Sequence, residues 1–170
     1  MRPHIESGPV DTKSYNQCVD LYSDRVYRYI LKNLKDADGA KDVVQDAYAR
    51  LWEVHDTIDL EKSKSWLFTT AYRVMIDGIR KNSKQSPLTE KHAEPIHSTG
   101  YSDLQEILNE ALDLLVPIQK QVVLLRDYEG YSYEEIGEIT ALNPSQVKVY
   151  LFRARKKLKD YLVSMENIIG

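Results

Sequence analysis

The sequence is poor in the features that mark secreted and membrane-spanning proteins. It contains one cysteine, Cys18, so no disulfide can form within the chain, and this usage is typical of a reducing cytoplasm. No uninterrupted apolar run is long enough to cross a bilayer. The first nine residues lack the apolar core of a signal peptide, and we expect residues 1–13 to form a disordered tail. These absences predict a cytoplasmic protein that does not insert directly into a membrane.

Motifs for catalysis and for cofactor binding are also missing. There is no phosphate-binding glycine loop, no paired-cysteine zinc site and no nucleophile elbow. The histidines are scattered, and His92 and His97 stand in a polar stretch without carboxylates or cysteines at ligand spacing. A helical hydrolase that uses clustered carboxylates is an alternative without a ligand-spaced set to support it. We therefore predict a protein that is not an enzyme, with no catalytic residue, metal or cofactor.

What the sequence does contain is helical periodicity along most of its length. Apolar residues recur at spacings of three and four, which predicts helices at about residues 14–34, 40–54 and 64–81. Each helix has one apolar stripe, so the three are expected to pack as a small bundle. The residues expected on these stripes include Cys18, Tyr22, Val26, Ile30, Val43, Ala47, Leu51, Trp52, Leu67, Ala71, Val74, Met75 and Gly78.

Residues 82–102 interrupt this pattern with polar and helix-breaking residues. The stretch is longer than ordinary loops within a domain, and it predicts a flexible linker. Periodicity resumes at Asp103, and Pro117 begins a further helix. The predicted fold class is all-α, with two small helical domains at residues 14–81 and 103–170.

The last forty residues carry the strongest local signals. Ser132 and Glu135 form a capping-box pair, and Asn143 is an N-cap candidate followed by Pro144 at the first helical position. Only a short connection separates these two helices, which predicts a helix-turn-helix. The second helix carries six bases and one acid over residues 144–160, as expected of a recognition helix in a phosphate-lined groove.

The net charge of −3 conceals a segregation of charge along the chain. Residues 36–56 hold six acids and two bases, residues 62–84 six bases and one acid, and residues 101–143 nine acids and two bases. Any one segment could be a solvated helix face. Their twofold alternation favours two kinds of partner, one polyanionic and one basic.

Aromatic and basic residues alternate at the start of the third predicted helix. Trp66, Phe68, Tyr72 and Arg73 stand close together there. Aromatic rings interleaved with bases suit single-stranded nucleic acid, because a base can stack while its phosphate is neutralised. The alternative, in which Trp66 and Phe68 anchor the core, is equally compatible with their spacing.

In this order and at this spacing, the motifs resemble the sigma-70 family of bacterial RNA polymerase initiation factors, in its extracytoplasmic-function (ECF) group. Residues 38–52 look like the core-polymerase-binding helix of region 2. Residues 66–81 look like the adjoining helix that recognises and melts the −10 element. Residues 128–155 look like region 4, which reads the −35 element, and the resemblance spans residues 15–161.

The resemblance implies a factor that directs core RNA polymerase to specific promoters and promotes strand opening. It implies as partners the β′ coiled coil and β flap of the polymerase, promoter DNA and an anti-sigma factor. The residues implied in core-polymerase binding are Asp42, Gln45, Asp46 and Arg50. Those implied at −10 DNA are Trp66, Tyr72, Arg73, Asp77, Arg80 and Lys81, and those at −35 DNA are Ser145, Gln146, Lys148, Val149, Arg153, Arg155 and Lys156.

The sequence departs from the pattern of the family at three places. Tyr72-Arg73 stands where an Arg-Asn pair is usual, Gly137 where alanine is usual, and Gln146 where threonine is common. These changes bear on the promoter sequence that is read. The rival interpretation is an autonomous helix-turn-helix regulator whose N-terminal bundle dimerises or senses a signal. It leaves the N-terminal motifs and the long linker unexplained.

Overall fold

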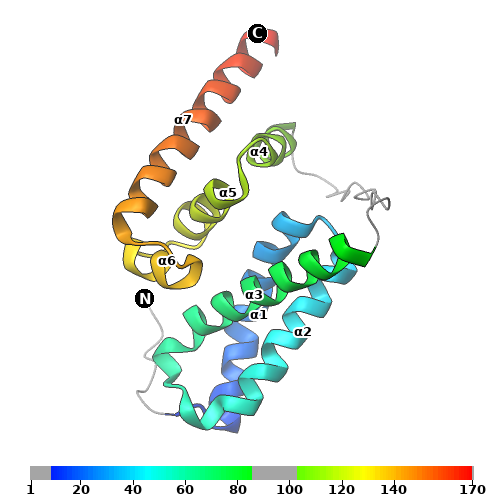
Figure 1. The fold of residues 1–170 in the computed structure, drawn as a ribbon, viewed down its shortest axis with the longest axis vertical. Coiled ribbons are helices and arrows are strands. Elements are labelled where there is room, and N and C mark those ends of the chain that lie inside the picture. The colour runs from blue at the N-terminus through cyan, green and yellow to red at the C-terminus, as the bar shows by residue number, and fades with distance from the viewer. Residues whose placement is uncertain (1–8, 86–102, 170) are drawn as a thin grey trace. The chain divides into compact units, whose positions relative to one another are not determined.

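The computed structural model describes residues 9–85 and 103–169 of the chain. Residues 1–8 of the expected tail and residues 86–102 of the expected linker lie outside the described residues. The chain divides into two compact units, Met1–Pro95 and Ile96–Gly170, and the all-α prediction is confirmed (Figure 1). Within the described ranges the only β pairing is an isolated bridge between Pro9 and Asp59.

The first unit contains α1 (Thr12–Leu34), α2 (Ala37–Val54) and α3 (Ser63–Gln85), which pack on one another. Val26, Ile30, Leu51 and Leu67 are fully buried, as the apolar stripes predict. Phe68 is also fully buried, and its ring centroid lies 5.3 Å from that of Tyr29. Phe68 therefore anchors the core, and of the two roles that its spacing left open, stacking with nucleic acid is excluded for this residue.

The chain enters the first unit earlier than expected. The side chain of Val10 is buried, and its backbone N–H donates to the carbonyl oxygens of His55 and Ile58 at 3.0 and 3.2 Å. Asp11 then caps α1 by accepting a hydrogen bond from the backbone N–H of Ser14 at 2.7 Å. Placing the end of the tail at residue 13 is therefore wrong, because residues 9–11 are already part of the folded unit.

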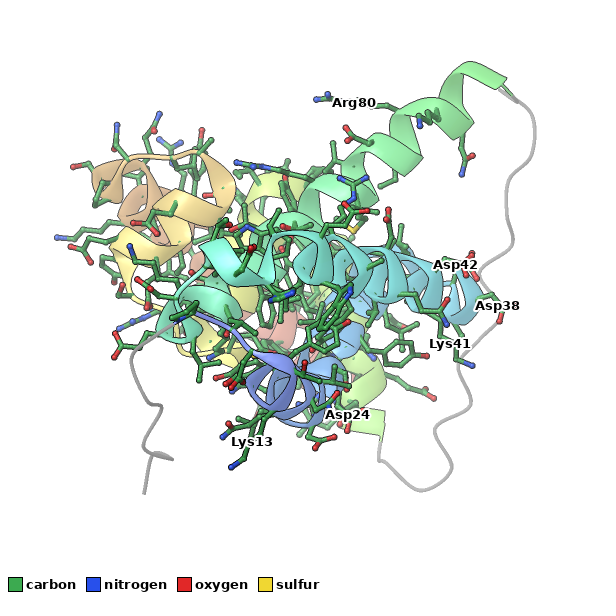
Figure 2. The ribbon with its side chains drawn as sticks, turned by 90° about the horizontal axis from the view of Figure 1, so that it is seen from below. Lys13, Asp24, Asp38, Lys41, Asp42 and Arg80 are labelled. Atoms are coloured by element: carbon green, nitrogen blue, oxygen red, sulfur yellow. The ribbon has the colours of Figure 1, made fainter. Side chains whose placement is uncertain are left out.

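The far end of α3 also differs from expectation. The helix continues to Gln85, so residues 82–85, assigned to the linker, are helical. Gly78, expected on the buried stripe, is exposed, and beyond its chain neighbours and the backbone of its own helix no described atom lies within 4 Å of where its Cβ would be. The reason is visible in Figure 2, where the end of α3 that carries Arg80 extends past the other helices of its unit.

The second unit contains α4 (Asp103–Asp113), α5 (Pro117–Val123), α6 (Tyr133–Thr140) and α7 (Pro144–Ile169), with a π-helical turn at Leu124–Tyr128. Buried residues from α5, α6 and α7 form its core: Val122, Ile136, Ile139, Val147, Leu151 and Ala154. The capping box that begins α6 is confirmed by two hydrogen bonds between Ser132 and Glu135, at 3.2 and 2.8 Å. No helix among the described residues is long and apolar enough to cross a membrane.

Candidate nucleic-acid interface

The turn between α6 and α7 is tightly closed. Ala141 ends α6 in the left-handed conformation with φ of 61°, and the backbone N–H of Leu142 donates to the carbonyl of Gly137 at 3.1 Å. A Cβ on Gly137 would collide with the backbone carbonyl oxygen of Leu142. The departure from the family pattern at this position therefore has a steric reason, since only glycine lets the two backbones approach so closely.

The start of α7 is fixed by a reciprocal pair of hydrogen bonds. The backbone N–H of Gln146 donates to Oδ1 of Asn143 at 2.8 Å, and the backbone N–H of Asn143 donates to Oε1 of Gln146 at 3.0 Å. This is a capping box built from two amide side chains. It confirms Asn143 as the N-cap and orients the first turn of the helix.

The outward face of α7 carries most of the residues implied at −35 DNA. Val147, Leu151 and Ala154 are buried on one side of the helix, which turns the opposite side to solvent. All seven members of the implied set are exposed: Ser145, Gln146, Lys148, Val149, Arg153, Arg155 and Lys156. The same face exposes 71% of Phe152, a residue that the resemblance left out. The sequence does contain a signal for this residue, because Phe152 is an aromatic residue next to Arg153 and lies outside the apolar stripe of a basic helix.

Arg155 differs from the other basic residues of α7. Its guanidinium makes two hydrogen bonds to the carboxylate of Asp127, at 3.2 and 2.5 Å. The hydrogen bond to Asp127 raises the pKa of Arg155 above its usual value. The pair joins α7 to the π-helical turn, so Arg155 braces the unit and its charge is already partly neutralised.

The outer face of α3 gathers the residues implied at −10 DNA. Trp66, Arg73, Asp77 and Arg80 are separated by seven, four and three residues, so they share one side of the helix. Trp66 is half-buried and the other three are exposed, as is Lys81. Tyr72 lies beside them, half-buried, and burial raises the pKa of its hydroxyl. Its phenol therefore stays neutral and remains a hydrogen-bond donor at physiological pH.

The face of α2 opposite the core holds the residues implied in polymerase binding. Asp42, Gln45 and Arg50 are exposed and Asp46 is half-exposed. Figure 2 shows Asp38, Lys41 and Asp42 pointing away from the bundle at the start of the helix. Nε of Arg50 lies 3.3 Å from Oδ1 of Asp46, and both side chains are about half-exposed. Such a pair is worth little in water, so both groups can be redirected toward a partner.

Trp52 lies at the edge of the same face. The sequence pattern places it in the core, but 45% of its surface is exposed. Its ring packs against Tyr15 and His55, with centroids 5.1 and 4.4 Å away, at the margin between α1 and the end of α2.

No group of three or more metal-binding side chains occurs in the part of the chain that the structure describes.

Comparison with known proteins matches one family region to each of the two helical units. Residues 18–85 match the sequence model of sigma-70 region 2, and residues 105–158 match that of sigma-70 region 4. The chain is 32% identical over 148 residues to the RNA polymerase sigma factor SigV of Bacillus subtilis, which covers 85% of this chain and 89% of SigV. It is 26% identical over 150 residues to the ECF sigma factor SigM of the same organism, covering 85% and 92%.

A solved structure shows the same architecture. The sigma factor RpoE of Bartonella quintana, determined in complex with the anti-sigma factor NepR, superposes with a TM-score of 0.77. The two sequences are 25% identical, and the match covers 89% of this chain and 98% of RpoE.

Regions 2 and 4 in this order define a transcription initiation factor with two helical domains. The chain belongs to the sigma-70 family, in the ECF group. It is thus an RNA polymerase sigma factor that directs promoter-specific transcription initiation, and it is not an enzyme.

Proposed function

We propose that three faces divide the work of initiation: α2 binds core polymerase, α3 recognises and melts the −10 element, and α7 reads the −35 element. The observation that carries the proposal is the separation of charge in the folded units. The acidic positions Asp42 and Asp46 lie on the outer face of α2, and the bases of α3 and α7 lie on the outer faces of those helices. Each face thus has the charge that its partner requires.

On the polymerase side, the outer face of α2 meets the basic coiled coil of the β′ subunit. Arg50 can exchange its weak contact with Asp46 for a partner carboxylate, which leaves Asp46 free to meet a base. The exposed ring of Trp52 extends this face with an apolar anchor of the kind that is enriched at interfaces. The acidic first part of the second unit, residues 103–143, docks on the β flap.

On the −10 side, α3 captures bases that leave the duplex. Extruding a base costs a few kcal/mol, so a surface that binds the extruded base selects for sequence. Trp66 and Tyr72 supply partly exposed rings for stacking, and Arg73 and Arg80 supply positive charge for the backbone. The tyrosine hydroxyl adds a neutral donor where the family usually carries arginine.

On the −35 side, α7 enters the major groove. Lys148, Arg153 and Lys156 neutralise phosphates and set the register, and the first turn approaches base edges. The exposed side chains of Val149 and Phe152 lie between these charges and suit contact with the methyl group of thymine.

Regulation and location follow from the same partners. RpoE, which this chain resembles in structure, was determined with an anti-sigma factor bound. A comparable partner that covers the polymerase-binding face would hold this chain inactive. Because core polymerase and promoter DNA are both cytoplasmic in bacteria, the cytoplasm is the site of action.

The test is reconstitution with core RNA polymerase. The full chain should be retained by immobilised core enzyme, and the two together should give run-off transcripts from a subset of a genomic fragment library. The control is core enzyme alone, which should give none of these transcripts. Retention of library fragments by the chain alone, without transcripts when core enzyme is added, would support the autonomous regulator instead.

A further inference from the structure

The side chain of Gln146 has a fixed orientation at the start of α7. Two backbone N–H groups take part in the capping box, and a backbone N–H can pair only with an acceptor. The atom of Gln146 that faces the N–H of Asn143 at 3.0 Å must therefore be the carbonyl oxygen Oε1. The amide nitrogen Nε2 is consequently the end of the side chain left over.

Nε2 is available to a ligand. Gln146 is exposed, and the only side-chain hydrogen bond that it makes within the described ranges is the one through Oε1. Nε2 carries two N–H donors and no acceptor. It stands in the first turn of α7, the part of a recognition helix that comes nearest to base edges.

We propose that Gln146 reads one base of the −35 element as a pure hydrogen-bond donor, through Nε2, while Oε1 stays in the cap. The inference rests on the proposed role of α7. In the major groove guanine presents two neighbouring acceptors, O6 and N7, which match the two donors of Nε2, and thymine presents O4. Cytosine presents a donor, and adenine presents a donor beside its acceptor. Guanine is therefore preferred, followed by thymine.

This reading differs from the usual one for glutamine. A free glutamine pairs with adenine through both ends of its amide, which requires the carbonyl to accept from N6. Here the capping box holds the carbonyl toward Asn143, so that arrangement would require the cap to open. The same cap fixes the rotamer before DNA arrives, so less conformational entropy is lost on binding.

Gln146→Glu separates the two tasks of the side chain. Glutamate keeps a carboxylate oxygen for the N–H of Asn143, so the cap and the thermal midpoint of the second unit should be retained. It lacks the N–H donors. Gln146→Ala removes the donors and also the hydrogen bond from the N–H of Asn143, which is half of the cap, so it should lower that midpoint as well as change the base preference.

The probe is a promoter that the wild-type holoenzyme selects from genomic fragments, with its −35 element then randomised. Binding by wild-type and Gln146→Glu holoenzymes is compared base by base. The added negative charge weakens all sequences alike and cancels in the ratio between bases. At one position the wild type should favour guanine over adenine by about three- to tenfold, as one hydrogen bond allows, and over cytosine by at least as much. Gln146→Glu should abolish that preference or shift it to cytosine, and leave other positions unchanged.

Two results would overturn the inference. Unchanged preferences in Gln146→Glu would show that Nε2 meets phosphate or solvent and no base. A wild-type preference for adenine at the affected position would show that the cap opens on DNA. A wild-type holoenzyme that selects no promoter in the first step would instead overturn the proposed function, so the two failures are distinguishable.

Discussion

Replacing Gly137 with alanine should destabilise the helix-turn-helix, although alanine is the usual residue of the family at this position. In a helix interior alanine is favoured over glycine by about 1 kcal/mol. Against this, the new Cβ would collide with the backbone carbonyl of Leu142, and backbone cannot rotate away as a side chain can. Overpacking of this kind costs about 1–3 kcal/mol, and opening the turn also weakens the hydrogen bond from Leu142 to Gly137.

The net expectation is a loss of about 1–2 kcal/mol from the free energy of unfolding of the second unit. For a domain of this size, 1 kcal/mol corresponds to roughly 4–8 °C in the thermal midpoint. Gly78→Ala is the matched control, because it makes the same change in an exposed helix where nothing lies within 4 Å of the new Cβ. It should stabilise the first unit by up to about 1 kcal/mol.

The two units can be followed separately during heating. Both tryptophans, Trp52 and Trp66, belong to the first unit, so tryptophan fluorescence reports its unfolding, while far-ultraviolet circular dichroism reports both units. Gly137→Ala should lower the midpoint temperature of the second unit, which is the circular-dichroism transition without a counterpart in fluorescence. Gly78→Ala should raise the midpoint temperature of the fluorescence transition, which reports the first unit. A Gly137→Ala protein as stable as the wild type would refute the steric reasoning about the turn.

Three further predictions concern charge and pH. Asp42→Lys or Asp46→Lys should weaken association with core polymerase, as measured by titration. The helical circular dichroism should be retained, because both carboxylates lie outside the buried stripe of α2. Unchanged affinity would exclude this docking face. Lys148→Ala and Arg153→Ala should weaken holoenzyme binding to all −35 variants alike, and each should reduce the salt dependence of log affinity by about one. Arg155→Ala should mainly lower the thermal midpoint of the second unit, because Arg155 pairs with Asp127. An equal change in salt dependence for all three variants would contradict the bracing role of Arg155. The hydroxyl of Tyr48 donates to the carbonyl of Cys18 at 3.0 Å, and burial raises the pKa of this hydroxyl. The stability conferred by the neutral phenol is therefore complete below about pH 10, the pKa of an unfolded tyrosine, and is lost as the pH rises toward the folded-state pKa. Denaturant unfolding at alkaline pH should show this decline, and its slope should be smaller in Tyr48→Phe.

Helix starts could be predicted from the sequence because capping is local. Ser132 and Glu135, and likewise Asn143 and Pro144, stand within four residues of one another, and each motif begins a helix where expected. The apolar stripes gave the core of the first unit for the same reason, since their period is a property of one helix.

Features that depend on partners distant in sequence could not be predicted in this way. The hydrogen bonds of Val10 are made to residues 45 and 48 positions away, so local patterns predict too late a start for the folded unit. The pairing of Arg155 with Asp127 cannot be read from local spacing, because Asp127 lies 28 residues earlier in the chain. The position of Trp52 on its helix predicts a core residue, but at the margin of the bundle almost half of its surface is exposed.

The same limit applies to the end of α3. Periodicity indicates which side of a helix is apolar, but it does not indicate how far the neighbouring helices extend alongside it. Gly78 continues the pattern of Ala71 and Met75, which are buried, yet it is exposed, as are residues 79–82 after it. Arg80 and Lys81 are exposed on the same segment of α3, which makes their positive charges accessible to a partner.

We expect this chain to recognise and open promoters only as part of a holoenzyme. The net charge of −3 includes a net +5 in residues 144–160, so the rest of the chain carries −8, which opposes the approach of the free chain to DNA. Footprinting on a selected promoter is the most direct measurement. The expected result is protection of both the −10 and −35 elements, with permanganate-reactive thymines near −10, only when core polymerase is present. Strong protection at both elements by the isolated chain would contradict it.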